Sequence, residues 1–158
     1  MIFVTVGSQK FQFNRLLKKI DELVDKKVIS DEVFAQVGVS DYKPINYDYI
    51  DFMTQEEFNK KIDKCSLLIT HAGTGVIVNA VKKGKKIIAT PRLAKYGEHV
   101  DDHQIQLIQQ FDELNFIEPL YDLEEIERKI REVNIKSYKK YVSNTDTIIN
   151  SIKEFINK

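Results

Sequence analysis

The sequence predicts a single α/β domain with a mostly parallel sheet and helices on both faces. Short apolar runs alternate along the chain with longer segments whose apolar residues recur at helical spacing. Polar turns at residues 7–9, 71–75 and 91–104 directly follow apolar runs. In a parallel α/β sheet such turns lie together beyond the carboxyl ends of the strands, where ligands bind.

The expected strands are short apolar runs bounded by turn residues. The first is Ile2–Val6, and the others are expected at residues 33–37, 45–52, 67–69, 87–90 and 115–117. Helices are expected between them, over residues 11–27, 54–63, 76–83, 101–111, 122–131 and 143–156. Thr54 and Glu57 have the spacing of a capping box, Gly84 is expected to end the third helix, and Asp122 is expected to cap the fifth.

Length and composition narrow the class of protein. The 158 residues suffice for one domain with a sizeable core, and no repeat or linker divides residues 1–158. Lys+Arg and Asp+Glu both number 24, so the net charge does not indicate a nucleic-acid partner. The single Cys65 adjoins an apolar run and is expected to be buried. With no secretory leader or membrane-spanning run in view, we expect a cytoplasmic protein.

The segment at 66–84 carries the strongest functional pattern. An apolar run ends before the turn Ala72-Gly73-Thr74-Gly75, and a helical pattern follows at once. A strand that ends in a glycine turn and opens a helix presents unpaired backbone N–H groups at the positive end of the helix dipole. This arrangement favours a phosphate or diphosphate, so a nucleotide is the expected ligand.

Two polar residues flank this turn. His71 could donate a hydrogen bond to a sugar hydroxyl or to a leaving diphosphate; alternatively, it is a structural histidine bonded to a carbonyl. Asn79 could reach ribose hydroxyls or be a neutral helix residue. The turn Gly7-Ser8-Gln9 occupies the position of a phosphate loop but could equally only reverse the chain. It matches neither the dinucleotide fingerprint nor the P-loop.

The segment at 91–104 is dense in functional groups. Its placement after a buried strand, opposite the glycine turn, favours a binding site over a solvated loop. The candidate residues are Arg92, Glu98, His99, Asp102, His103 and Gln104. Asp101 or Asp102 could also cap the following helix. Adjacent acids without a matching His or Cys elsewhere make a poor metal cage, so no metal is expected.

Lysine pairs recur at 82–83, 85–86 and 139–140. They are expected to form solvated faces, and contact with an anionic membrane surface is the alternative. No nucleophile elbow is present, and nothing places two carboxylates across a sugar.

Three segments in order resemble the C-terminal, donor-binding domain of GT-B glycosyltransferases. They are Phe3–Ser8, the turn Thr70-His-Ala-Gly-Thr-Gly75, and Gly97-Glu-His-Val-Asp-Asp-His-Gln104. The chain is similar to the group containing the peptidoglycan N-acetylglucosaminyltransferase. It most resembles the short, single-domain members: the catalytic subunit of the eukaryotic UDP-GlcNAc transferase of N-glycan assembly and bacterial capsule or exopolysaccharide β-1,4-galactosyltransferase subunits. The resemblance covers residues 2–117 and implies a Rossmann-like half of a GT-B enzyme.

The resemblance also implies roles for individual residues. Gly73, Thr74 and Gly75 would bind the diphosphate of UDP, and the uracil would lie near residues 52–54. Ser8 and Gln9 would lie on the phosphate or acceptor side. The residues expected around the donor hexose are Glu98, His99, His103 and Gln104. Relatives usually carry Asp or Glu at the position of Asn79, so the ribose contact is expected to be weaker or rearranged.

The implied reaction is inverting transfer of a hexose, expected to be galactose, from a UDP-sugar to a polyprenyl-diphosphate-linked sugar. A complete GT-B enzyme has two domains, so the resemblance implies a membrane-associated partner that binds the acceptor and recruits this chain to the inner face of the cell membrane. The base is expected at His71 or on that partner, and no metal or other cofactor is expected. The alternatives are a non-catalytic UDP-sugar-binding or activating subunit, and a UDP-sugar hydrolase or epimerase-type enzyme.

The C-terminal segment at 136–158 is a candidate docking element for the partner, and an ordinary closing helix is the alternative. It is unusually rich in apolar positions for a terminal helix. They are Tyr138, Tyr141, Ile148, Ile149, Ile152, Phe155 and Ile156.

Overall fold

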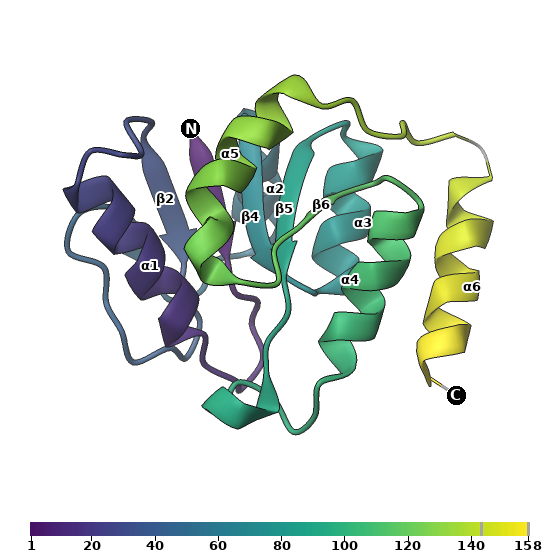
Figure 1. The fold of residues 1–158 in the computed structure, drawn as a ribbon, viewed down its shortest axis with the longest axis horizontal. Helices are drawn as coiled ribbons and strands as arrows, with labels where there is room; N and C mark the ends of the chain where they lie inside the picture. Colours follow the sequence, from purple (N-terminus) through teal and green to yellow (C-terminus); the bar gives the residue numbers. More distant parts are fainter. Residues whose placement is uncertain (143, 158) are drawn as a thin grey trace.

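The computed structural model describes residues 1–142 and 144–157. Its strands form one six-stranded sheet of order β3-β2-β1-β4-β5-β6, and every pairing is parallel (Figure 1). The strands are β1 (Ile2–Thr5), β2 (Val33–Gln36), β3 (Asp48–Ile50), β4 (Leu67–His71), β5 (Lys86–Thr90) and β6 (Glu118–Pro119). The predicted α/β fold is confirmed. The strand order reverses direction between β1 and β4, and such a point opens a crevice at the carboxyl ends of the strands.

Helices cover both faces of the sheet. They are α1 (Asn14–Asp25), α2 (Gln55–Lys64), α3 (Thr74–Lys82), α4 (His103–Glu113), α5 (Ile126–Ile135) and α6 (Thr145–Asn157), with 3-10 turns η1 (Ala94–Tyr96) and η2 (Leu123–Glu125). In Figure 1, α1 and α5 lie on one face, whereas α2, α3 and α4 lie on the other, with α6 packed outside α4. No described helix is long and apolar enough to cross a membrane.

The alternation of side chains along each strand supplies both cores. Ile2 and Val4 of β1 pack under α1 and α5, whereas Phe3 packs with α2 and α3 on the opposite face. Leu67 and Ile69 of β4 likewise belong to the first core, and Leu68 belongs to the second. Because both faces are buried, these strands begin with consecutive apolar residues, and polar residues appear only at their carboxyl ends. These apolar runs are the pattern that identified them.

Local chemistry confirms several of the expected boundaries. Thr54 and Glu57 form the capping box at α2, with the Thr54 hydroxyl accepting from the Glu57 N–H at 3.1 Å. Gly84 has φ +69° just after α3, the left-handed conformation that ends a helix. Cys65 is buried, as expected.

The strand expected at 115–117 is wrong, because the pairing with β5 lies at Glu118–Pro119. Asn115 adopts φ +59° and its N–H bonds the carbonyl of Asp112, so it ends α4 rather than opening a strand. Phe116 and Ile117 are buried in the core between these elements. Phe116 and Ile117 are therefore apolar because they are buried, not because they pair with a neighbouring strand.

Several helices begin later than expected. The first begins at Asn14, because the amide of Phe13 is held by the Ser40 hydroxyl at 2.9 Å. The fourth begins at His103, and Asp122 caps η2 through the N–H of Glu124, so α5 starts only at Ile126. The last helix begins at Thr145; the expected start at residue 143 lies outside the described residues.

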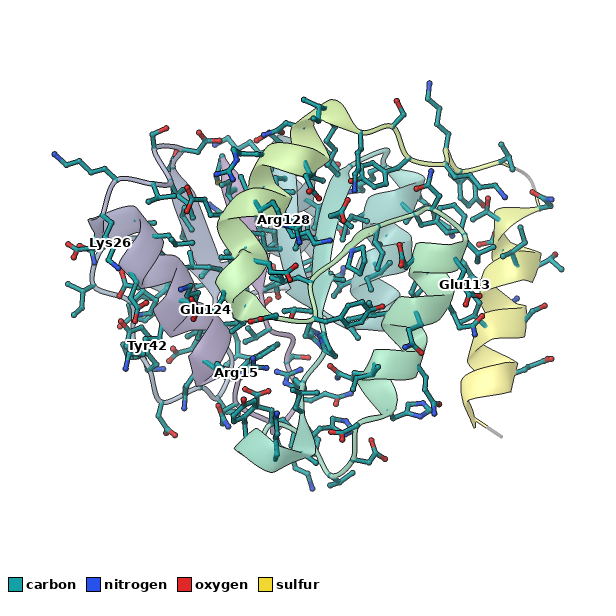
Figure 2. The ribbon with its side chains drawn as sticks, viewed as in Figure 1. Arg15, Lys26, Tyr42, Glu113, Glu124 and Arg128 are labelled. Carbon is teal, nitrogen blue, oxygen red and sulfur yellow. The ribbon has the colours of Figure 1, made fainter. Side chains whose placement is uncertain are left out.

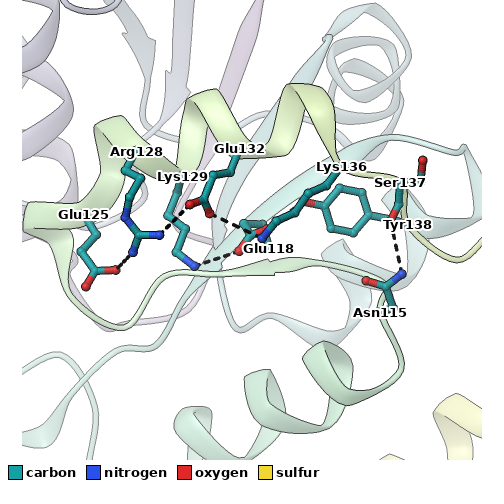
Figure 3. Close-up of polar contacts among 9 residues, drawn as sticks. All are labelled: Asn115, Glu118, Glu125, Arg128, Lys129, Glu132, Lys136, Ser137 and Tyr138. Atoms are coloured by element: carbon teal, nitrogen blue, oxygen red, sulfur yellow. Dashed lines mark hydrogen bonds and ion pairs between the residues drawn. The ribbon is translucent and has the colours of Figure 1, made fainter.

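The C-terminal segment is anchored at two places. Glu118 accepts hydrogen bonds from Lys129, Lys136 and Tyr138 at 2.8–2.9 Å, which fixes the start of the linker to α6 (Figure 3). On α6, Ile149 and Ile152 are buried against the α4 core, which favours the closing-helix alternative for these positions. Docking through the segment stays a prediction. The side chains of residues 155 and 156 lie outside the described part.

Candidate functional site

The polar turns expected to converge do meet at the carboxyl ends of the strands. They surround a cavity of about 520 Å³. Gly7, Ser8 and Gln9 line it from the turn after β1, and His71, Ala72, Gly73, Thr74 and Gly75 line it from β4 and the start of α3. His99, His103 and Gln104 line the third side. The sequence therefore identified most of the wall of this cavity.

A second cavity of about 300 Å³ adjoins the first, because Gly7, Ser8, Gly75 and Val76 line both. It extends past Met53 to Asn79. These are the regions where the uracil and the ribose were expected. Together the two cavities have the size of a pocket for a nucleotide-sized ligand.

The first turn of α3 faces the main cavity with free donors. Its N-cap residue, Gly73, provides no side-chain hydrogen bond to the helix. Thr74, Gly75 and Val76 follow in the first turn and line the cavity. The backbone N–H groups of a helix start and the helix dipole favour an anion at this position.

His71 is packed between two glycines. It ends β4 and is only 7% exposed. A Cβ atom built on Gly7 would lie 2.7 Å from its Nε2 atom, and one built on Gly73 would lie 2.6 Å from the same atom. Real Cβ atoms do not approach so closely. Glycine at both positions is therefore a requirement of the ring's location.

The protonation of His71 follows from its contact with Arg92. The Nη1 atom of Arg92 lies 2.9 Å from Nδ1 of His71, and a guanidinium has only donors. Nδ1 must then accept, so the proton of the neutral ring is on Nε2. Burial, and secondarily the charges of Arg92 and His99, lower the pKa of His71 to about 3. His71 is thus a neutral N–H donor whose Nε2 lies between Gly7 and Gly73.

Arg92 supports the site from behind and does not line the cavity. It is 1% exposed, and its Nη2 donates to the carbonyls of Val6 and Phe11. Its backbone N–H donates to Oε1 of Gln104 at 2.9 Å. Burial lowers the pKa of Arg92 to about 10, so it stays charged at neutral pH. Arg92 therefore joins the segment after β1 and the end of β4 through its side chain, and the start of α4 through its backbone N–H.

Glu98 and Asp102 also act as supports. Glu98 is fully buried, receives both Nε and Nη2 of Arg15 at 3.0 Å, and accepts the N–H of Leu93 (Arg15 is labelled in Figure 2). Asp102 accepts the N–H of Ala94 at 2.8 Å. Neither lines the cavity. The role of Arg15 was not foreseen, because a basic residue on an exposed helix face carries no distinguishing pattern.

The remaining polar residues surround the open end of the main cavity. His99 stacks on Phe11, another unforeseen neighbour, with ring centroids 4.7 Å apart. Asp101 accepts the N–H of His103 at 2.9 Å, whereas the N-cap residue of α4 is Asp102, whose side chain forms no cap hydrogen bond. Because Oε1 of Gln104 is engaged by Arg92, its amide nitrogen is left to donate. Such a set of donors and acceptors could bind sugar hydroxyls.

In the second cavity, Asn79 donates through Nδ2 to Oδ1 of Asn59 at 2.9 Å, which leaves the Asn79 oxygen as an acceptor. Among residues 1–142 and 144–157, no group of three or more His, Cys, Asp or Glu side chains is placed to hold a metal ion.

Comparison with known proteins agrees with this geometry. Over residues 1–158 the chain matches the glycosyltransferase family 28 C-terminal domain. The chain belongs to this family. It is 24% identical over 144 residues to the UDP-N-acetylglucosamine transferase subunit ALG13 of Candida albicans. That match covers 87% of this chain and 47% of the relative, so the chain spans about half the length of that protein.

Solved structures share the fold. The solution structure of ALG13 superposes with a TM-score of 0.65 at 18% identity, covering 99% of this family 28 domain and 96% of the chain in that structure. The glycosyltransferase of kitacinnamycin superposes with a TM-score of 0.63 at 12% identity, covering 99% of this chain and 39% of that one. The predicted resemblance to a GT-B half is confirmed at the level of the fold.

Proposed function

We propose that this chain is the donor-binding subunit of a split, inverting glycosyltransferase. It transfers a hexose from a UDP-sugar to a polyprenyl-diphosphate-linked sugar in exopolysaccharide or capsule synthesis. Galactose is the first candidate for this hexose. One observation carries the proposal: the His71 N–H and the first turn of α3 converge on a single cavity. Membership of glycosyltransferase family 28 supports the class of reaction.

The convergent donors suit a departing diphosphate. The acceptor hydroxyl oxygen attacks the anomeric carbon, and the bond from that carbon to UDP breaks with its electron pair moving to the diphosphate. The N–H groups of α3, the Thr74 hydroxyl and Nε2–H of His71 would stabilise the growing charge. Preorganised donors of this kind do the work that a metal ion does in other enzymes, so we propose metal-independent transfer.

The base that removes the acceptor proton belongs, in this proposal, to the partner. Nδ1 of His71 already accepts from Arg92, and Nε2 carries a proton. A conjugate-acid pKa of about 3 also makes His71 too weak a base for a hydroxyl. His71 is instead proposed as the donor to the leaving group.

Exposed apolar side chains on the loops at this end of the sheet favour the presence of a second domain that faces this one. Exposed apolar side chains lie on three loops that follow β2, β3 and β5. They are Val39, Phe52, Tyr96 and Val100, which are 45%, 48%, 48% and 75% exposed. Apolar side chains gathered at one edge mark an interaction surface. We assign this edge to the membrane-associated subunit that binds the acceptor.

Transfer of N-acetylglucosamine is the second candidate, because the Candida albicans relative is named as a UDP-N-acetylglucosamine transferase subunit. Calorimetric titration with UDP-galactose, UDP-glucose and UDP-N-acetylglucosamine separates the two. We expect tighter binding of UDP-galactose. Preferred binding of UDP-N-acetylglucosamine would replace galactose in the proposal.

A transfer assay tests the catalytic role. The chain is mixed with the acceptor-side subunit, the lipid-linked acceptor and labelled UDP-sugar, and transfer should be lost in His71→Ala and His103→Ala. Full activity in both variants would indicate a non-catalytic binding or activating subunit. Rapid UDP release without any acceptor would instead indicate a hydrolase.

A further inference from the structure

The lysine pairs singled out in the sequence converge on one groove at the amino ends of the strands. The turn between α3 and β5 supplies Lys82, Lys83, Lys85 and Lys86 to one wall. The linker between α5 and α6 supplies Lys136, Lys139 and Lys140 to the other. The groove has a volume of about 580 Å³, and none of its described lining residues is acidic.

Part of this charge has a structural explanation. Lys82 and Lys83 lie at the end of α3, and Lys136 follows α5, where a cation stabilises the C-terminus of a helix. Each also forms an ion pair. The carboxylate partners, at 3.4, 2.8 and 2.9 Å respectively, are Asp146, Asp63 and Glu118 (the last is drawn in Figure 3).

The other four lysines are not paired with carboxylates of the described residues. The ammonium groups of Lys85 and Lys86 bond backbone carbonyls at the C-terminal ends of α2 and α5, where a cation also stabilises a helix. Lys139 lies 5.7 Å above the ring of Phe116, and both it and Lys140 are exposed. Among the described side chains, none of these lysines forms an ion pair. In a chain with a net charge of zero, the groove is a local excess of positive charge, with four lysines that have no carboxylate partner among the described residues.

We propose that this groove binds an acidic peptide segment of a partner protein. Lysines on two facing walls match carboxylates that project from both sides of an extended peptide, and Tyr138 and Tyr141 add apolar surface with hydroxyl groups. The concave shape suits a peptide better than a flat lipid surface.

The position of the groove also favours a peptide. It lies at the amino ends of the strands, near the linker that crosses the top of Figure 1, whereas the donor cavity lies at the carboxyl ends. A membrane at the groove would therefore face away from the cavity that a lipid-linked acceptor must reach. This step of the argument rests on the proposed function.

Fluorescence anisotropy of a labelled octaglutamate peptide, with octaglutamine as the control peptide, tests the inference on the full chain. We expect binding that weakens as salt rises, because screening shortens the range of the charges. Lys139→Gln with Lys140→Gln should lower the affinity about three- to tenfold. Lys18→Gln with Lys26→Gln removes the same charge from exposed positions at α1 and should leave the affinity unchanged (Lys26 is labelled in Figure 2).

Absence of octaglutamate binding, or an equal loss in both double variants, would overturn the inference. So would binding to phosphatidylserine vesicles without binding to the peptide, since a lipid would then be the occupant. UDP titration of the same preparations separates this inference from the proposed function. Retained UDP binding without peptide binding refutes the groove alone, whereas peptide binding without UDP binding refutes the donor site alone.

Discussion

Replacing Gly73 by alanine tests the packing of the histidine most directly. The backbone at Gly73 has φ −83° and ψ 111°, which any residue adopts, so the substitution introduces no backbone strain. The new Cβ atom, however, would lie 2.6 Å from both Cε1 and Nε2 of His71. The whole effect of Gly73→Ala therefore comes from contact with the ring.

The size of the effect follows from the distance. To reach an ordinary contact of 3.4 Å the ring must move by about 0.8 Å, which disturbs its 2.9 Å hydrogen bond with Arg92. Overpacking and a weakened charge-assisted hydrogen bond together cost about 2 kcal/mol. For a chain of this length that loss lowers Tm by about 4–8 °C. Displacement of the Nε2–H should also weaken UDP binding, by about tenfold if one charge-assisted hydrogen bond is lost.

Gly75→Ala is the matched control. A Cβ atom on Gly75 meets nothing within 4 Å, and the residue is helical, so alanine should raise stability by about 0.5–1 kcal/mol. In the proposed complex the diphosphate approaches this backbone, so the added methyl group should still weaken UDP binding. Gly73→Ala should therefore lower the free energy of unfolding and Gly75→Ala should raise it, whereas both variants should weaken UDP binding.

Thermal unfolding and UDP calorimetry measure both variants. A Gly73→Ala variant as stable as the wild type would show that the ring is not where the structure places it. Unchanged UDP affinity in Gly75→Ala would show that the nucleotide does not approach the start of α3.

Three further predictions concern neighbouring groups. His71 has a pKa of about 3, below the value of 6.5 in the unfolded chain, so its contribution to stability is present above pH 6.5 and is lost as the pH falls toward 3. The free energy of unfolding should fall by at most about 1.4 kcal/mol per pH unit over this range. Urea unfolding should show this pH dependence, and His71→Gln should reduce it. Glu98→Gln removes the carboxylate that pairs with Arg15 and whose charge favours the ionised form of buried Arg92. The substitution should cost about 2–4 kcal/mol in the same assay, and a neutral result would contradict the support role. Asn79→Asp supplies a charged acceptor and should tighten UDP binding several-fold in calorimetry; weaker binding would mean that Asn79 does not face the ribose.

Much of the fold could be predicted because its determinants are local. The buried strands are built around short, consecutive apolar runs, and the capping box at Thr54 and the left-handed Gly84 act within a few residues. The edge of the sheet could not be predicted. Phe116 and Ile117 are apolar because they are buried in the core, and the residues that do pair, Glu118 and Pro119, have low strand propensity.

The residues of the site could likewise be predicted where local sequence determines their position, and not where contacts with distant residues do. Residues that line the cavity, such as Gly73 and His103, were identified from their position after strands. Arg92 and Glu98 were assigned to the cavity because they are polar and adjacent in sequence to its wall, but their partners lie about 80 residues away in the chain. Only the folded structure shows that such long-range contacts turn both side chains inward.

The most direct test of the account is calorimetric titration of the purified chain with UDP and the three UDP-sugars, without added metal. The account predicts UDP binding that persists in the presence of a chelator, a preference for one sugar, and weaker binding in Gly75→Ala. Absence of binding at millimolar UDP, both alone and with the acceptor-side subunit present, would contradict the assignment of this cavity to the donor.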